Sequence, residues 1–281
     1  EVHAPFLPPS PFRERFTAGY SGWIRDYCDE LEAEEKKRLD GFSGLFKRRQ
    51  EFSKPDVDYL IGLYDGEIAY TDAELARFWN FLDQSGTSSD LLAVIVSDHG
   101  EEFGEHGEFS HKNLYDSVVH VPLVITLPAA LRSEGDRHRI PHQACLVDVM
   151  PTLIDLLRIT PPPYLQGRSL IPLWQGEGFD QPAYSEVIDF GPDPLCHSVR
   201  DGKHKLLNYA SGQYFELFDL EQDKDEKADC SQSMPDTGRA LLQLLNRRRE
   251  MDAKLRDQFR ARSQAGRLPS DVEEDLRKLG Y

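Results

Sequence analysis

Apolar side chains between Ser53 and Ser85 recur with the period of a helical turn, about 3.6 residues, which predicts a long amphipathic helix. Ser53 and Pro55 are suited to its start, and acidic residues in the first turn suit the helix dipole. The pattern ends at Ser85-Gly86. The apolar positions are Leu60, Leu63, Tyr64, Ile68, Leu75, Phe78, Trp79 and Leu82.

Two short and mainly apolar runs, 91–96 and 121–127, predict buried strands. Further along, Asp148 is suited to cap a helix whose first turn tolerates Pro151. The other predicted elements of this part are a charged helix over 23–38, a helix over 148–157, a short helix over 170–174 and a strand over 183–187.

From about residue 191 the pattern changes to short strands separated by hairpin-type turns at Asp201-Gly202 and Ser211-Gly212. The predicted strands are 197–200, 205–209 and 214–220, and an amphipathic helix follows with Leu241, Leu244, Leu245, Met251 and Leu255. We therefore interpret residues 1–190 as an α/β domain. Residues 191–281 are interpreted as a C-terminal subdomain with an antiparallel sheet and a helix.

The charge balance narrows the classes of partner. The chain has 33 Lys and Arg against 49 Asp and Glu, a net charge of −16. Because a phosphate backbone favours clustered basic residues, we expect no nucleic-acid partner. The dense basic run at 246–249 is followed by Glu250 and is typical of a solvated helix face. No apolar run reaches the ~18 residues of a membrane span.

The four cysteines are widely separated along the chain. None has Cys-x-x-Cys spacing, so they predict neither a zinc knuckle nor a disulfide framework and leave the compartment open. The chain begins at Glu1 without Met or a signal-like segment, which we interpret as a cut end that hides any upstream targeting segment. The cysteines are Cys28, Cys145, Cys196 and Cys230.

Candidate chemistry is concentrated directly after the first predicted strand. Residues 97–112 read Ser-Asp-His-Gly-Glu-Glu-Phe-Gly-Glu-His-Gly-Glu-Phe-Ser-His-Lys. Ligands in open α/β sheets bind outside the carboxyl ends of the strands. A carboxylate next to an imidazole offers two donors to a divalent ion. Asp98 and His99 are therefore candidate metal ligands; the alternative is a capped turn with a hydrogen-bonded histidine.

Other residues of this region could contact an anion. His111 and Lys112 lie about one turn before Tyr115-Asp116, where a short helix is predicted to start. A cationic group there would bind a substrate oxygen or protonate a leaving group, although a surface lysine and a loop histidine fit the spacing equally well. His106 is interpreted as a loop-shaping residue. His3, judged by itself, is a loop histidine near one end of the chain.

Residues 97–125 contain Ser-Asp-His-Gly-Glu-x-x-Gly-Glu-His-Gly, His-Lys, Leu-Tyr-Asp and Val-Pro-Leu-Val-Ile. This combination resembles the sulfatase family of the alkaline-phosphatase-like superfamily, and the resemblance extends over nearly the whole chain. It implies a three-layer α/β/α sheet, here truncated at its N-terminal side, with a smaller C-terminal antiparallel sheet plus helix. The supporting segments are His3-Ala-Pro-Phe, Leu63 to Asp72, Leu146 to Leu157, Leu165 to Leu170 and 198–220.

The resemblance implies a sulfuric ester hydrolase that acts on small-molecule or glycan sulfate esters. Asp98 and His99 would hold a divalent cation, which is calcium in most sulfatases, and His3 would contact the sulfate. In many relatives a lysine that binds the sulfate or the leaving oxygen stands four residues before the tyrosine. Here that position is His111, and Lys112 stands three before Tyr115, so both are candidates.

Sulfatases take their formylglycine nucleophile from a Cys/Ser-x-Pro-x-Arg motif and further metal ligands from an N-terminal aspartate pair. The 281 residues contain neither feature, and the nearest string, at 9–13, has Pro9 in the nucleophile position. We therefore expect that about the first third of the enzyme is absent and that this chain alone is inactive. Loss of N-terminal strands from a parallel sheet would also expose an apolar edge and favour aggregation.

Two other functions fit the same residues. A phosphodiesterase or phosphonate monoester hydrolase of the same superfamily would share the 97–112 loop, because sulfate and phosphate esters are both tetrahedral anions. A non-catalytic binding or scaffold protein would keep this part of the fold without a nucleophile.

Overall fold

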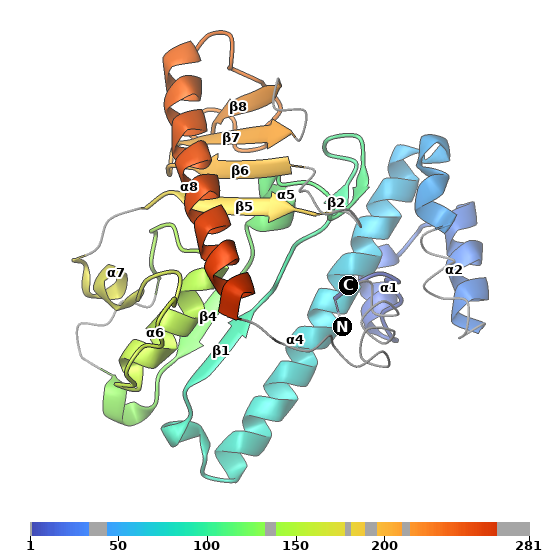
Figure 1. The fold of residues 1–281 in the computed structure, drawn as a ribbon. Coiled ribbons are helices and arrows are strands. Elements are labelled where there is room, and N and C mark those ends of the chain that lie inside the picture. The colour runs from blue at the N-terminus through green and yellow to red at the C-terminus, as the bar shows by residue number, and fades with distance from the viewer. Residues whose placement is uncertain are drawn as a thin grey trace.

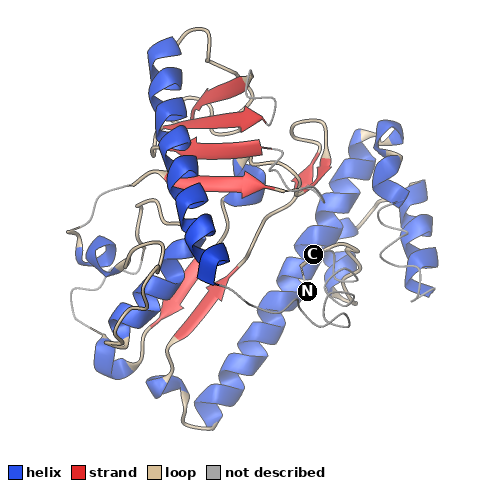
Figure 2. Ribbon diagram, viewed as in Figure 1, coloured by secondary structure: helices blue, strands red, loops and turns tan. Residues whose placement is uncertain are grey.

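The computed structural model describes residues 2–33, 44–132, 139–177, 181–188, 196–209 and 214–262. Its elements are labelled in Figure 1 and coloured by type in Figure 2. The helices are α1 (Phe12–Thr17), α2 (Trp23–Ala33), α4 (Lys54–Gln84), α5 (Asp116–Val119), α6 (Val149–Leu156), α7 (Ile171–Gln175) and α8 (Pro235–Arg262). The strands are β1 (Ala93–Val96), β2 (Glu102–Phe103), β3 (Phe109–Ser110), β4 (Leu123–Thr126), β5 (Ala183–Val187), β6 (Cys196–Arg200), β7 (His204–Tyr209) and β8 (Phe215–Asp219).

The long helix α4 begins and ends as the sequence predicts. Ser53 is its N-cap, and the backbone N–H of Ser53 donates to the Asp56 carboxylate at 2.8 Å, which satisfies a group that the helix leaves unpaired. Helix α1, which the sequence did not predict, packs against α4. A Cβ at Gly62 would lie 2.6 Å from the carbonyl oxygen of Phe16, so glycine is required for this close approach.

The N-terminal core forms where α2 and α4 meet the segment that precedes α1. Phe6, Ile24, Leu60 and Leu63 are fully buried there. The predicted helix over 23–38 is confirmed for Trp23–Ala33, and the rest of it lies outside the described residues. This core fixes the N-terminal segment, and with it His3, against the first half of α4.

Strands β1 and β4 confirm the two predicted strands but are not buried as expected. They pair antiparallel, with Ala93 opposite Thr126 and Val96 opposite Leu123. Val96 is 43% exposed and Val124 51% exposed. Among the described residues these strands pair only with each other, so no neighbouring strand covers their outer sides. The connection between the two strands, residues 97–122, contains β2, β3 and α5.

In Figure 1 the β1–β4 pair is drawn between α4 and α6, an arrangement of helix, sheet and helix. Exposed apolar side chains lie on all of these elements. They include Phe78 and Phe81 of α4, Val96 of β1, Val124 of β4, and Met150 of α6. These residues are called the exposed apolar group below. None of the helices among the described residues combines the length and apolar character needed to cross a membrane.

The C-terminal sheet has the order β5-β6-β7-β8, with every neighbouring pair antiparallel. Helix α8 runs along one face of this sheet in Figure 1, where Leu241 and Leu245 are buried against Val199, Leu206 and Leu217. The predicted hairpin turn at Asp201-Gly202 is confirmed, whereas Ser211-Gly212 lies outside the described residues. The boundary between residues 190 and 191 stays a prediction, but β5, which precedes it, pairs with β6 and is the first strand of this sheet.

Candidate active site

The turn that ends β1 is fixed by backbone contacts to α5. The Ser97 hydroxyl donates to the carbonyl of His99 at 2.6 Å, and the N–H of Gly100 donates to the carbonyl of Val118 at 2.6 Å. A Cβ at Gly100 would lie 2.2 Å from the carbonyl oxygen of Ser117. Only glycine fits here, and this close packing aims the side chains of residues 98 and 99.

Three histidines from distant parts of the chain converge beside this turn. One ring nitrogen each of His3, His99 and His111 lies within 4.8 Å of the others. The rings of His99 and His111 are stacked with centroids 4.0 Å apart, and the His3 ring lies 5.3 Å from that of His111. The structure therefore brings together three of the five predicted site residues.

Asp98 lies on the edge of this cluster. Its Oδ1 accepts the backbone N–H of His99 at 3.0 Å and lies 3.9 Å from Nε2 of the same histidine. The Asp98 side chain is 67% exposed. A carboxylate and an imidazole thus face one another at the strand end, with the carboxylate on the solvent side.

His111 and Lys112 have different environments. The His111 ring lies in the histidine cluster, and its Nδ1 donates to Oε2 of Glu101 at 3.3 Å. Lys112 is exposed, and its backbone N–H donates to the Ser110 hydroxyl. Of the two candidates, His111 is the one whose side chain meets His3 and His99.

Glu101 is a site residue that the sequence did not single out. Its side chain is only 4% exposed, and its second oxygen, Oε1, has no hydrogen-bond partner in the described part of the chain. Burying a carboxylate costs free energy unless it is paired or hydrogen-bonded, and the His111 ring is its partner here. Its position in Asp-His-Gly-Glu was visible in the sequence, but its burial depends on tertiary packing.

His3 is held in place by the residues that follow it. The N–H of Leu7 donates to the buried carboxylate of Glu67 at 3.0 Å. The ring of Phe6 packs edge-on against Tyr64 with centroids 5.3 Å apart. These contacts anchor the N-terminal segment on α4, so that a histidine 96 positions before His99 in the sequence reaches the same site.

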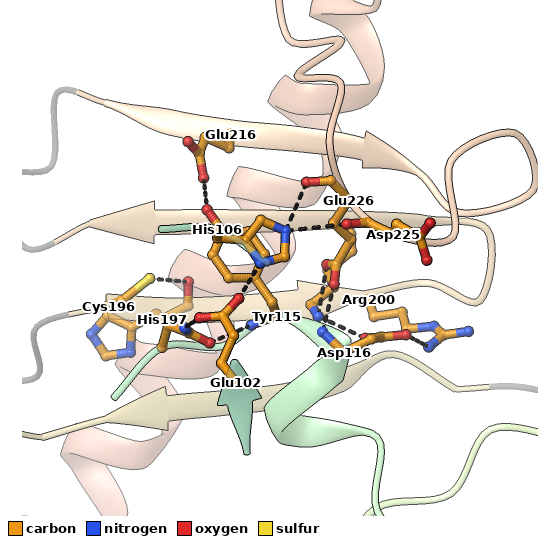
Figure 3. Close-up of polar contacts among 12 residues, drawn as sticks. Glu102, His106, Tyr115, Asp116, Cys196, His197, Arg200, Glu216, Asp225 and Glu226 are labelled. Carbon is orange, nitrogen blue, oxygen red and sulfur yellow. Dashed lines mark hydrogen bonds and ion pairs between the residues drawn. The ribbon is translucent and has the colours of Figure 1, made fainter. Parts of the chain in front are cut away.

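Polar contacts hold the loop that follows Glu101 against the C-terminal subdomain, and Figure 3 shows them. The buried carboxylate of Glu102 accepts hydrogen bonds from His106 and Asn113. The other ring nitrogen of His106 faces the carbonyls of Asp225 and Glu226, both at 3.1 Å. The His106 ring also stacks on Tyr115, with centroids 3.5 Å apart. His106 therefore shapes the loop, as interpreted, and links it to the C-terminal subdomain.

A second link is ionic. Lys205 of β7 is 1% exposed, and its Nζ lies 2.7 Å from Oδ1 of Asp116 and 2.8 Å from Oε1 of Glu226. Arg200 also pairs with Asp116, at 2.8 Å (Figure 3). Burial alone would raise the pKa of Asp116, but Lys205 and Arg200 hold it below its usual range. Burial raises the pKa of Glu226.

None of the four cysteines is an activated thiol. Burial raises the pKa of Cys28 and of Cys196 to about 12, and the pKa values of Cys145 and Cys230 are raised for the same reason. Nucleophilic cysteines need the opposite shift, because the thiolate is the reactive form. No cysteine of this chain therefore has the environment of a thiolate nucleophile.

The arrangement of helices and strands is that of the alkaline-phosphatase-like fold. The sulfatase family model matches residues 2–159, and the model described as N-sulphoglucosamine sulphohydrolase, C-terminal, matches residues 104–252. Because the sulfatase model matches more than half of this chain, the chain belongs to the sulfatase family. The expected alkaline-phosphatase-like α/β fold, with its smaller C-terminal antiparallel sheet, is confirmed.

Known relatives agree with this membership. The chain is 28% identical to arylsulfatase K of Mus musculus over 206 residues, which is 69% of this chain and 36% of that protein. It is 26% identical to an N-acetylglucosamine-6-O-sulfatase of Bacteroides thetaiotaomicron over 230 residues, 78% of this chain and 38% of that protein. The chain thus spans well under half the length of these relatives.

A solved structure is also similar. The phosphonate monoester hydrolase of Agrobacterium radiobacter superposes with a TM-score of 0.62 at 25% identity, covering 72% of this chain and 43% of that one. Sulfate and phosphonate ester hydrolases therefore share this arrangement of helices and strands.

Proposed function

We propose that this chain is the part of a sulfate ester hydrolase that gathers a divalent cation and the sulfate at the end of β1. The observation that carries the proposal is the meeting of His3, His99 and His111 beside Asp98. Positive charge held in a partly enclosed site stabilises the negative charge that develops on the transferring oxyanion.

Each predicted site residue has a role in this proposal. Asp98 and His99 would hold the cation, which supplies positive charge next to the ester oxygens when bound. His3 would orient the sulfate. His111, or Lys112 beside it, would contact the leaving oxygen and give it a proton as the bond to sulfur breaks. Water is the second reactant and its oxygen ends on sulfur, so the products are the alcohol and inorganic sulfate.

Calcium is the ion that the family resemblance implies, but the donors present here suit it poorly. Calcium takes six to eight oxygen ligands. Asp98 offers carboxylate oxygens, whereas the ring nitrogens of the three histidines form the rest of the cluster. The proposed function therefore requires a divalent cation without depending on calcium.

Turnover also requires a nucleophile that these 281 residues do not contain. No Cys/Ser-x-Pro-x-Arg motif occurs in the sequence, and burial raises the pKa of all four cysteine thiols. We therefore propose that this chain by itself binds metal and anion but does not hydrolyse esters, since removal of a nucleophile leaves only binding and electrostatic stabilisation.

For the substrate we propose a sulfate ester on a glycan or another small molecule. Support comes from the Bacteroides thetaiotaomicron relative, whose name describes action on N-acetylglucosamine 6-O-sulfate. A phosphonate monoester is the second candidate, because the Agrobacterium radiobacter enzyme has the same fold at 25% identity.

Hydrolysis by the natural full-length polypeptide that contains this chain tests the proposal. Its kcat/KM is compared for aryl sulfate, aryl phosphonate monoester and aryl phosphodiester substrates. We expect the aryl sulfate to have the highest kcat/KM of the three substrates. Preference for the phosphonate would support the second candidate, and no hydrolysis of any substrate would support a binding or scaffold protein.

A further inference from the structure

Glu226 has a backbone conformation that residues with a side chain rarely adopt. Its φ angle is +53°, in the left-handed region that is unfavourable for residues with a Cβ. The residue is also only 2% exposed. Strain of this kind persists only where surrounding contacts determine the conformation, and it is concentrated at functional sites. The contacts of Glu226 therefore indicate what this conformation achieves.

The carboxylate of Glu226 holds the start of α5. Its Oε2 accepts the backbone N–H of Asp116, the residue at which α5 begins, and the first N–H groups of a helix have no partner within the helix. Its Oε1 lies 2.8 Å from Nζ of Lys205. The carboxylate thus connects the first residue of α5 to the C-terminal sheet.

The backbone around Glu226 holds the β2–β3 loop. The carbonyls of Asp225 and Glu226 each lie 3.1 Å from Nε2 of His106, and Lys227 donates from Nζ to the carbonyl of Glu105. One residue of the C-terminal subdomain therefore contacts the β2–β3 loop with its carbonyl and α5 with its carboxylate (Figure 3).

The contact to α5 reaches the turn that carries Asp98 and His99. The N–H of Gly100 donates to the carbonyl of Val118 in α5 at 2.6 Å. A Cβ at Gly100 would lie 2.2 Å from the carbonyl oxygen of Ser117, so the turn and α5 are in direct backbone contact. Helix α5 has four residues and is too short to be stable without tertiary contacts. A displacement of its start would therefore move the turn as well.

The contact to the loop reaches Glu101 and His111. His106 donates from Nδ1 to the carboxylate of Glu102, which is fully buried and directly follows Glu101. The same carboxylate accepts a hydrogen bond from the side-chain amide of Asn113, two residues after His111. The two ends of the β2–β3 loop are therefore joined at Glu102, and His106 connects this junction to the C-terminal subdomain.

We infer that Glu226 is a positioning residue of the active site, which sets the placement of the Asp98-His99 turn relative to His111. It acts through α5 and through His106 and contributes no atom to the reaction. It rests on the proposed function only for the statement that these residues form an active site. The hydrogen bonds that support the positioning role are the same whichever ester is hydrolysed.

Three substitutions separate positioning from stability. Glu226→Gly and Glu226→Ala both remove the carboxylate, but glycine adopts a positive φ readily and alanine does not. Glu226→Gly should therefore unfold at a higher urea concentration than Glu226→Ala. A positioning role predicts the same defect at the site in both variants, despite this difference in stability. Glu226→Gln keeps an oxygen for the N–H of Asp116 and should recover most of the placement.

Hydrogen exchange of the natural full-length polypeptide, measured by mass spectrometry, is the first readout because it does not depend on hydrolysis. We expect exchange at 97–101 and 113–119 to be about tenfold faster in Glu226→Gly and Glu226→Ala, the effect of losing one hydrogen bond to a charged group. Exchange in α8 should change less. The control is Glu221→Ala, which removes an exposed carboxylate from the same segment and should exchange like the unchanged protein.

The second readout is kcat/KM for an aryl sulfate, measured where circular dichroism shows every variant folded. It should fall at least about tenfold in Glu226→Gly and Glu226→Ala, because small displacements of positioned groups slow catalysis, and Glu226→Gln should recover part of the loss. Unchanged exchange at 97–101, or defects that follow the urea midpoints and not the loss of the carboxylate, would overturn the inference. Faster exchange at 97–101 in a polypeptide that hydrolyses no ester would support the positioning role and count against the proposed function.

Discussion

The ammonium group of Lys205 lies 2.7 Å from the carboxylate of Asp116, although the two residues belong to different halves of the chain. Asp116 opens α5, the helix packed under the Asp98-His99 turn, and Lys205 lies in the middle of the C-terminal sheet. The same lysine pairs with Glu226. The C-terminal subdomain therefore braces the site rather than lying beside it.

Replacement of Lys205 should be strongly destabilising. Lys205→Met leaves Asp116 and Glu226 buried without their shared cation, and removal of one partner of a buried pair costs about 3–5 kcal/mol. Urea unfolding measures this change. The control is Lys203→Met, whose pair with Glu221 is well exposed and should contribute no more than about 1 kcal/mol. Equal effects of the two substitutions would argue against a bracing role for Lys205.

Asp116 should make this junction sensitive to acid. Although burial acts to raise it, Lys205 and Arg200 lower the pKa of Asp116 below the usual value of 3.8. Its stabilising contribution is then complete above pH 3.8 and is lost as the pH falls through the lower value of the folded state. Urea midpoints measured between neutral and acidic pH should fall more steeply for the unchanged protein than for Asp116→Asn. Parallel curves would show that Asp116 titrates alike in the folded and unfolded states.

Helices and strands could be predicted from the sequence where capping residues, apolar spacing and turn residues define their bounds. Ser53, Pro55 and the apolar spacing after them define α4, and Asp201-Gly202 sits at the turn between β6 and β7. Burial could not be predicted in the same way. The apolar runs at β1 and β4 have the composition of buried strands, but their exposure depends on which strands lie beside them, which a local pattern does not contain.

Local sequence pattern also placed some residues of the candidate site but not others. Asp98 and His99 follow a strand directly, so their position was visible in the sequence. His3 and His111 reach the same place only through the packing of Phe6 and the loop between β3 and α5. Glu101 could not be distinguished from the exposed acidic residues of its loop, because its burial arises from contacts distant in sequence.

The exposed apolar group should make the 281-residue chain prone to association. Side chains such as Val96, Val124 and Phe81 are exposed on both faces of the β1–β4 pair and on α4, and exposed apolar surface binds hydrophobic dyes and other molecules. We expect strong ANS fluorescence and concentration-dependent aggregation, both reduced by the double substitution Val96→Thr and Val124→Thr. Met251→Thr, which changes an exposed residue of α8, is the control. A cooperative thermal transition of a monomer without dye binding would contradict this expectation.

Gly100 should tolerate no side chain. In Gly100→Ala the new Cβ would lie 2.2 Å from the carbonyl of Ser117, so the turn must shift away from α5 and carry Asp98 and His99 with it. Displacement of Asp98 and His99, the proposed metal ligands, should weaken metal binding at least about tenfold. Calorimetric titration of the variant, with circular dichroism to verify its helices, measures the effect. Unchanged metal affinity would mean that these side chains do not depend on the turn for their position.

The proposed cation position at the end of β1 is tested most directly by the effect of Asp98→Ala on aryl sulfate hydrolysis by the natural full-length polypeptide. Asp90→Ala, an exposed aspartate before β1, is the matched control. We predict that kcat/KM falls more than about 100-fold for Asp98→Ala, since loss of an outer partner of a metal alone costs 10–100-fold, and is unchanged for Asp90→Ala. Undiminished hydrolysis by Asp98→Ala would contradict the placement of the cation at the end of β1.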